Sequence, residues 1–498
     1  MNIRQRQRAH VLLITFVIFG AAPGCGNGGR GDGDGDAAED ARQDDVLQDD
    51  APSDPPADAD GADDTAGEDA VPDVPRDEDG QDAADGETFN PPFPRLGAYF
   101  IGNPHAYDTA EFREVAANYH VLIVGQWDGW ESGRSMTMSE AMQDIRAASA
   151  EGIVFFIYIN MNELEDPMDP SSANYERWQK IEEENWWLYV SGTGGTRVDS
   201  TWSADMTIVN TTDYCPADSD GKDWKTWYAD WVVDRFVRGG GRNSPNSVVD
   251  GFFMDNVFWK PRVDGDWDRD GSTDSQDDAD VQHDFREGYV GFFDHLRTAW
   301  PEGRYQIGNI ADVASDEAWP GSLADYGQVM DGGVMEGLIG ESWSVEEWGG
   351  FDALMRTYNR MMDLDRPPRL NIFGHDNLGT TDYREMRYGL TACLMDDGYY
   401  FASGESYWPS GLWFDEFDVD LGYPTQPRQE SAWSGGVWRR DFEGGIALCN
   451  PRDNGAQTVD LGAELRKISG TQDPGVNDGS LVTSVTLEDR DGIILLWP

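Results

Sequence analysis

The stretch from Val248 to Trp259, VVDGFFMDNVFW, constrains the fold of this chain more than any other. Its apolar run stops abruptly at Asp255-Asn256. A strand of a parallel sheet that is covered on both faces reads as such a continuous apolar run. A carboxylate and an amide directly after it would lie at the strand's carboxyl end, which is the active-site face of a (β/α)8 barrel. An ordinary strand-to-loop junction with solvated polar residues is the alternative, so the other strands must decide.

Apolar segments of strand length alternate with amphipathic segments of helical period from Pro91 to about residue 430. Strands are expected at 95–102, 120–130, 153–162, 251–254, 305–309, 333–337, 369–374 and 398–403. Helices are expected at 109–119, 175–184, 224–237, 287–300, 351–362 and 383–394, and a further one begins at a capping box of Thr137 and Glu140. This alternation predicts the α/β class and a (β/α)8 TIM barrel. A doubly wound sheet is the alternative, but no Gly-rich phosphate turn follows the first strand.

Residues 1–25 have the pattern of an export signal. Three arginines precede an apolar run, residues 11–20, that is too short to span a bilayer. Small residues and then Cys25 follow, so the segment resembles a bacterial lipoprotein signal in which the cysteine is lipidated. Ala22 stands where leucine is usual, and plain secretion is the alternative. Because Gly26 is not the aspartate of an inner-membrane retention signal, the outer membrane or cell surface is favoured, with membrane contact through the lipid anchor only.

Residues 26–88 are rich in Asp, Gly, Ala and Pro and are expected to form a disordered acidic linker, because they cannot bury enough surface to offset their ordering entropy. The chain carries a net charge of −57. Residues 30–88 contribute −20 through 23 acidic and 3 basic residues, and the first ten residues contribute +3, which leaves −40 for residues 89–498. This sign disfavours a nucleic acid partner and suits a neutral or cationic substrate, or bound metal ions.

The C-terminal residues 431–498 lack helical periodicity and read as short strands separated by turns. They are expected to form a small antiparallel, β-sandwich-like domain that packs on the catalytic barrel, residues 89–430, and does no chemistry. The cysteines outside the signal have no metal-ligand spacing and can form at most one disulfide; they are Cys215, Cys393 and Cys449.

Polar residues follow every expected strand, and in a barrel they would converge on one rim. The spacing suggests no Ser-His-Asp set, no Cys-His pair and no H-E-x-x-H motif, which leaves carboxylate chemistry without an organic cofactor. Glycoside hydrolysis needs two carboxyl groups beside the scissile bond, and the expected catalytic pair is Asp255 and Glu336, within about 10 Å of each other. Asp128 and Glu341 are their rivals. The residues expected to bind substrate are Tyr99, Gln126, Trp127, Asp128, Asn160, Asn256, Asn309, Glu341 and Trp343.

Five motifs also carry a family resemblance: RLGAYFIG, MTIVNTT after a Trp-rich insertion, DGFFMDN, VMEG and the strands around IALCNP. With them the chain, from about Pro91 to its end, resembles hypothetical glycosyl hydrolase family 15, a family of secreted bacterial barrels, and more loosely the endo-polygalactosaminidase-like families. The resemblance implies a TIM barrel, and Asp255 and Glu336 fall on its matching acidic positions. It does not supply a substrate.

The loop DWDRDGSTDSQD, residues 266–277, has the spacing of an EF-hand-type calcium loop. Carboxylates at alternating positions can converge on one cation, and the glycine at the sixth position allows a sharp turn. No helix clearly precedes the loop, and a merely acidic surface loop is the alternative. The expected structural Ca²⁺ ligands are Asp266, Asp268, Asp270, Ser272 through its carbonyl, Asp274 and Asp277.

Two functions from different classes are consistent with these patterns. The first is a lipid-anchored glycoside hydrolase that acts on an extracellular polysaccharide or oligosaccharide. The second is a non-catalytic, carbohydrate-binding surface lipoprotein on the same barrel. The paired acids favour the first, and the arrangement of Asp255 and Glu336 in space discriminates between them.

Overall fold

The computed structural model describes residues 89–100, 104–125, 136–172, 174–239, 248–301, 303, 305–310, 322–404 and 413–498. The expected signal segment with Cys25 and the acidic linker lie outside these residues, as do three of the expected substrate-binding residues, Gln126, Trp127 and Asp128. Within the described ranges, no helix has both the length and the apolar character needed to span a bilayer.

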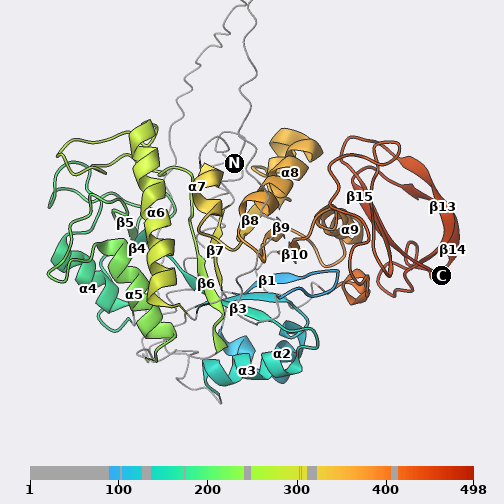
Figure 1. The fold of residues 1–498 in the computed structure, drawn as a ribbon, viewed down its shortest axis with the longest axis horizontal. Coiled ribbons are helices and arrows are strands. Elements are labelled where there is room, and N and C mark those ends of the chain that lie inside the picture. Colours follow the sequence, from blue (N-terminus) through green and yellow to red (C-terminus); the bar gives the residue numbers. More distant parts are fainter. Residues whose placement is uncertain are drawn as a thin grey trace, which may run out of the picture. The chain divides into compact units, whose positions relative to one another are not determined.

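Eight parallel strands form one sheet in the order β1-β2-β3-β6-β7-β8-β9-β10 (Figure 1). The strands are β1 (Gly97–Phe100), β2 (Val121–Val124), β3 (Val154–Ile159), β6 (Gly251–Met254), β7 (Tyr305–Asn309), β8 (Gly333–Ile339), β9 (Ile372–His375) and β10 (Tyr399–Ala402). A parallel bridge between Leu96 and Tyr400 joins the first strand to the last, and the Tyr400 amide donates to the Arg95 carbonyl at 2.8 Å. The predicted (β/α)8 barrel is therefore confirmed.

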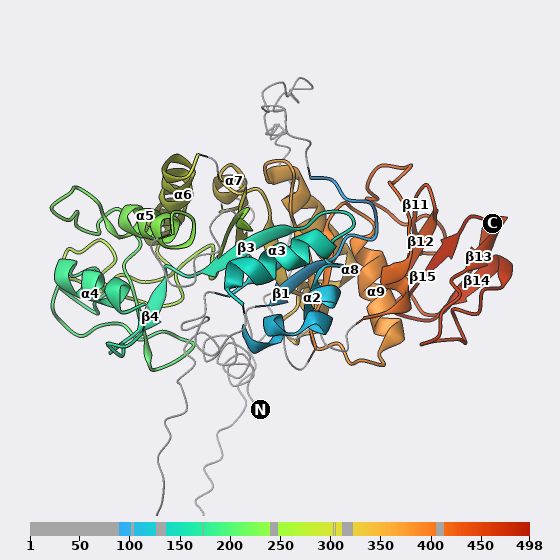
Figure 2. The same ribbon diagram turned by 90° about the horizontal axis from the view of Figure 1, so that it is seen from below.

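Helices alternate with the strands, and α2 and α3 lie against the β1–β3 part of the wall (Figures 1 and 2). The helices of the barrel are α2 (Ala110–Ala116), α3 (Met138–Ala148), α6 (Ala279–Ala299), α7 (Ser322–Gly327), α8 (Val345–Leu364) and α9 (Tyr383–Cys393). The predicted capping box is present: Glu140 N donates to Thr137 Oγ1 at 3.2 Å, and Thr137 N donates to the Glu140 carboxylate at 2.7 Å. Helix α6 begins earlier than predicted because buried Val281 and Phe285 extend its apolar face.

The interior of the barrel is a packed core and not a pore. Tyr99, Phe156, Tyr158 and Phe253 belong to one interior cluster of buried side chains that all the strands supply. The rings of Tyr99 and Tyr158 stack with their centroids 6.2 Å apart. Because the interior is filled, polar groups that must meet a substrate are confined to the strand ends.

An insertion between β3 and β6 contains the antiparallel pair β4 (Glu163–Glu165) and β5 (Met206–Ile208), with helices α4 (Tyr175–Glu184) and α5 (Trp224–Phe236). The sequence predicts α4 with these bounds but does not predict β4 and β5, because three-residue strands show no readable period. Trp186, Trp187 and Trp224 are fully buried in this insertion, so these rings form a core and not a surface for stacking sugars.

The C-terminal strands form a single antiparallel sheet in the order β11-β12-β15-β13-β14. They are β11 (Trp438–Asp441), β12 (Gly445–Asn450), β13 (Gln457–Lys467), β14 (Leu481–Leu487) and β15 (Asp491–Leu496). A sandwich-like domain is expected from the sequence, and the strands instead belong to one sheet. A register shift between Asp460 and Leu465 bends β13, and Leu465 then joins Ile446 and Ile493 in one apolar cluster. The curved sheet thus covers its own apolar face.

Buried arginines attach this sheet to the barrel. Arg387 on α9 donates to Asp473 Oδ2 at 2.7 Å and to the Gly492 carbonyl at 3.2 Å. Arg440 on β11 donates to Asp397 Oδ1 at 2.6 Å. Each guanidinium is nearly inaccessible to solvent, so its charge must be matched by these acceptors.

Candidate active site

Asp255 lies directly after β6, at the carboxyl end of the barrel strands. Its backbone amide donates to the Ile159 carbonyl at 2.8 Å, which continues the sheet ladder for one residue. Asn256 then adopts a left-handed conformation with a φ of 59°, which turns the chain out of the sheet. A non-glycine residue with this φ is uncommon and marks a position that its surroundings hold in place.

Three donors surround the buried Asp255 carboxylate. Tyr158 Oη donates to Oδ2 at 2.6 Å, while Asn309 Nδ2 and the Asn256 amide donate to Oδ1 at 3.0 and 2.9 Å. Burial raises the pKa of Asp255 above its ordinary value, and these hydrogen bonds oppose the increase because they favour the charged form. The three donors therefore offset part of the cost of burying the charge, while the pKa of Asp255 stays above its ordinary value.

Glu336 lies in β8 at a local irregularity of the sheet. The register between β8 and β9 shifts between Met335 and Ile339, and such bulges re-aim side chains beside active sites. Gly337, with a φ of 71°, follows, and a Cβ there would collide with the ring of Trp343 at 2.1 Å. The glycine is required both by this conformation and by the close approach of the indole.

Asn309, the last residue of β7, joins the two acids. Its single Nδ2 donates to Asp255 Oδ1 at 3.0 Å and to Glu336 Oε2 at 2.8 Å, so these two oxygens lie no more than about 6 Å apart. The structure thus brings together four of the residues expected at the site, Asp255, Asn256, Asn309 and Glu336. The separation lies well inside the limit of about 10 Å for a glycosidase pair.

Glu163, the first residue of β4, is a third acid at the site that the sequence analysis missed. It is 3% exposed, its Oε1 accepts from Asn256 Nδ2 at 3.2 Å, and its Oε2 accepts from the Ser200 hydroxyl. Burial raises its pKa to about 7, and the nearby charge of Asp255 adds to the increase. The available signal was its position just beyond the third expected strand, after Asn160 and Asn162.

The other expected substrate-binding residues have different surroundings. Tyr99 is 1% exposed and packs on Tyr158 beneath the acids, so in this structure it supports the site without offering a contact surface. Asn160 is half-buried, accepts a hydrogen bond from the Asn162 amide at 2.9 Å, and its side chain also hydrogen-bonds Glu163, which lowers the pKa of that acid. Glu341 is half-buried, and its charge helps burial to raise the pKa of Asp376 to about 6.

The acidic loop 266–277 brings some of its expected ligands together. Carboxylate oxygens of Asp266, Asp268 and Asp274 all lie within 4.8 Å of one another, and burial and the two neighbouring charges raise the pKa of Asp274. Asp270 and Ser272 are exposed, and Asp277 forms an ion pair with Lys260. Three converging carboxylates are the hard oxygen donors that Ca²⁺ prefers, so this part of the loop fits the ion.

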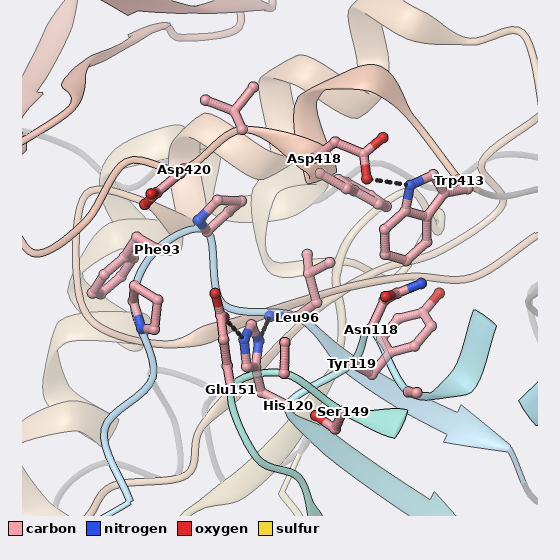
Figure 3. Close-up of a pocket in the computed structure, with 16 residues that line it drawn as sticks. Phe93, Leu96, Asn118, Tyr119, His120, Ser149, Glu151, Trp413, Asp418 and Asp420 are labelled. Atoms are coloured by element: carbon pink, nitrogen blue, oxygen red, sulfur yellow. Dashed lines mark hydrogen bonds and ion pairs between the residues drawn. The ribbon is translucent and has the colours of Figure 1, made fainter. Parts of the chain in front are cut away.

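A separate cavity of about 210 Å³ lies at the opposite, amino end of β1, β2 and β3 (Figure 3). His120 Nε2 contacts Glu151 at 2.8 Å there, and Trp413 Nε1 donates to Asp418 at 3.0 Å (Figure 3). In a barrel the catalytic groups gather at the carboxyl ends of the strands, and this cavity lies at their amino ends. The cavity is therefore distinct from the acidic cluster.

The sequence matches one family model, and its similarity to solved structures is distant. The model of hypothetical glycosyl hydrolase family 15 matches residues 153–446. The glycoside hydrolase domain of PelA from Pseudomonas aeruginosa is 13% identical, with 64% of this chain and 96% of that chain covered at a TM-score of 0.34. The cyclic alpha-maltosyl-(1→6)-maltose hydrolase from Arthrobacter globiformis is 12% identical, with 84% and 94% covered at a TM-score of 0.42. No curated protein matches the sequence. Such distant structures transfer neither residue roles nor a substrate to this chain.

Proposed function

The chain belongs to hypothetical glycosyl hydrolase family 15, a family of glycoside hydrolases, and we propose that it cleaves an extracellular polysaccharide with the carboxyl groups of Asp255 and Glu336. The observation that carries this proposal is the bridge made by Asn309, whose one amide nitrogen donates to both acids. Two carboxyl groups held this close can act on opposite sides of one glycosidic bond.

The surroundings of the two acids support different roles. Asp255 is buried among three donors that favour its ionised form, which suits the nucleophile. Glu336 is half-buried and can exchange a proton with a leaving group or a water molecule, which suits the acid and base. The short separation fits the spacing of about 5–5.5 Å in retaining enzymes better than the wider spacing of inverting ones. Attack by Asp255 on the anomeric carbon, with Glu336 giving its proton to the departing glycosidic oxygen, would break the glycosidic bond and form a glycosyl-enzyme ester. Water that gives a proton back to Glu336 would then break the ester and release the sugar with its configuration retained.

The charge of the chain narrows the substrate class. With −40 on residues 89–498, an anionic polysaccharide would be repelled, while a neutral or cationic one would not. The alternative, a carbohydrate-binding lipoprotein without catalysis, would retain the acids only as hydrogen-bond acceptors for sugar hydroxyls.

We also propose that the loop 266–277 binds a structural Ca²⁺ through Asp266, Asp268 and Asp274. The loop contacts the insertion, because Gly192 N donates to Asp266 Oδ2 at 2.7 Å and Thr273 Oγ1 donates to the Val190 carbonyl at 2.6 Å. A bound cation would relieve the repulsion among the acids and so stabilise the loop and the segment it contacts. The lipid anchor at Cys25, with a place on the outer membrane or cell surface, remains part of the proposal.

The test is a screen for released reducing ends on dextran, starch, cellulose, xylan, chitin, cationic chitosan and anionic pectin. Wild-type protein should act on a neutral or cationic member, and Asp255→Asn and Glu336→Gln should each lower kcat at least about 10³-fold. Glu347→Gln, an exposed acid on α8 paired with Arg452, is the matched control and should retain activity. Binding of a polysaccharide without any release of reducing ends by the wild type would favour the non-catalytic alternative. The anomer released first, followed by NMR, would decide between retention and inversion.

A further inference from the structure

Glu163 is a buried acid without an ion pair among the described residues, and it accepts a hydrogen bond from Asn256, the residue next to Asp255. The antiparallel pairing of Glu163 with Ile208 holds the start of β4 in place. Its carboxylate accepts from the Ser200 hydroxyl and from the side-chain amides of Asn256 and Asn160, all of them neutral donors. A buried carboxyl with neutral donors only is costly to ionise, so a structural role alone does not explain why an acid is present here.

A continuous set of hydrogen bonds runs from Glu163 to the proposed nucleophile. Asn256 donates to Glu163 through its side chain and to Asp255 Oδ1 through its backbone amide, at 3.2 and 2.9 Å. The carbonyl of Asn256 accepts from Tyr289 Oη at 2.8 Å, so both ends of the residue are held. These contacts maintain the left-handed turn that places Asp255 at the rim of the barrel.

We propose that Glu163 is a positioning residue of the glycosidase site, which fixes Asn256 and, through its own charge, tunes Asp255 and the transition state. This inference rests on the proposed function. It assigns to the insertion a part in the reaction, because β4 supplies Glu163 and the segment before β5 supplies its partner Ser200.

The charge of Glu163 changes in the pH range where such an enzyme works. Burial places its pKa at about 7, so at lower pH the group holds a proton and at higher pH it adds a negative charge beside Asp255. The titratable groups that face it are Asp255 at the end of β6, Tyr158 on β3 and Tyr289 on α6. Burial raises the pKa of both tyrosines well above 10, so they stay neutral. Positive charge develops on the sugar ring in the transition state, and an ionised Glu163 would stabilise it.

The first test compares Glu163→Gln with wild type across pH, on the polysaccharide from the screen that the wild type cleaves fastest. The variant keeps the shape and the acceptor oxygen but cannot ionise. Its kcat/KM should match that of the wild type within about 2-fold at pH 5 and fall about 10-fold below it at pH 8. Glu165→Gln is the control, because Glu165 lies two residues further along β4 and is half-buried. A ratio of wild type to Glu163→Gln that does not change with pH would overturn the proposal.

Ser200→Ala provides a second arm that leaves Glu163 in place. The Ser200 hydroxyl lowers the pKa of Glu163. Its loss should therefore move the change in kcat/KM that accompanies ionisation of Glu163, near pH 7, to higher pH. A change that stays at the same pH would contradict the role of Glu163 even if the Glu163→Gln protein does not fold.

A readout without substrate separates this inference from the proposed function. Stability due to protonated Glu163 is fully present below its unfolded pKa of about 4.3 and is lost as pH rises through about 7. The Tm of Glu163→Gln relative to wild type should therefore rise between pH 5 and pH 8. If the difference in Tm between the two proteins is the same at both pH values, Glu163 does not ionise in this range. Inactivity of the wild type on every polysaccharide would overturn the proposed function, whereas a pH-independent ratio in an active pair of proteins would overturn only the role of Glu163.

Discussion

Tyr158 donates a hydrogen bond of 2.6 Å to Asp255 from inside the barrel, one residue before β3 ends at Ile159. The two residues are far apart in sequence, and the bond forms because β3 and β6 are neighbours with Tyr158 paired to Phe253. The phenol is buried and stays protonated, so it is a permanent donor to the carboxylate.

Replacing Tyr158 by phenylalanine is expected to make Asp255 harder to ionise. The hydroxyl favours the charged form and lowers the pKa of Asp255, so its loss raises that pKa. Since the nucleophile must be ionised, the acidic limb of the kcat/KM profile should move to higher pH, and activity at pH 5 should fall about 10-fold or more. Tyr388→Phe, which removes a 2.7 Å hydrogen bond to Glu346 away from the acids, is the control. If the acidic limb of the kcat/KM profile is the same in Tyr158→Phe as in wild type, Asp255 is not the nucleophile.

Calcium removal is expected to lower the Tm of the full chain. A cation that binds only the folded protein stabilises it in proportion to RT ln(1 + [L]/Kd), so a chelator should reverse that gain. Asp268→Asn together with Asp274→Asn should abolish the sensitivity to chelator. Asp277→Asn should retain it, because Asp277 pairs with Lys260 outside the three converging carboxylates. If calorimetry shows no binding of Ca²⁺, the loop is an acidic surface segment without a metal site.

Membrane attachment is expected to depend on one atom, the Cys25 sulfur. Cys25→Ser should move the protein from the membrane fraction to the soluble fraction, because a lipid chain is then no longer attached. Mass spectrometry of the mature N-terminus gives the direct measurement. A wild type that is already soluble with an unmodified N-terminus would show plain secretion instead.

Residues next to a buried strand could be located from the sequence, and residues brought in by the insertion could not. Asp255, Asn309 and Glu336 each follow or end an apolar run, and a parallel barrel places all such positions on one rim. Glu163 meets Asn256 across 93 positions of sequence, through a short strand whose pairing has no periodic signal. Burial and long-range pairing, which also place Tyr99 beneath the site and Trp186 in a core, are decided by tertiary packing and not by local pattern.

Asp365, at the C-terminal end of α8, is expected to limit stability at alkaline pH. It is 2% exposed, and burial, with the charge of Asp331 nearby, raises its pKa to about 8. In the unfolded chain its pKa is about 3.9, so between these two values the folded state binds more protons and the free energy of unfolding falls as pH rises. The stability that protonated Asp365 contributes is therefore fully present below about pH 4 and is lost as pH passes through about 8.

Asp365→Asn cannot undergo this loss, so its Tm should equal that of the wild type near pH 4 and exceed it by a few degrees at pH 8.5. Asp331→Asn is the matched control, since Asp331 is a neighbouring buried acid that does have an ion pair, with Arg297 at 3.1 Å. Removing its charge leaves that arginine without its partner, and the Tm should fall. Thermal unfolding of the three proteins across pH distinguishes the two effects, and a Tm for Asp365→Asn that stays at or below the wild-type value at pH 8.5 would mean that Asp365 is ionised in the folded protein without penalty.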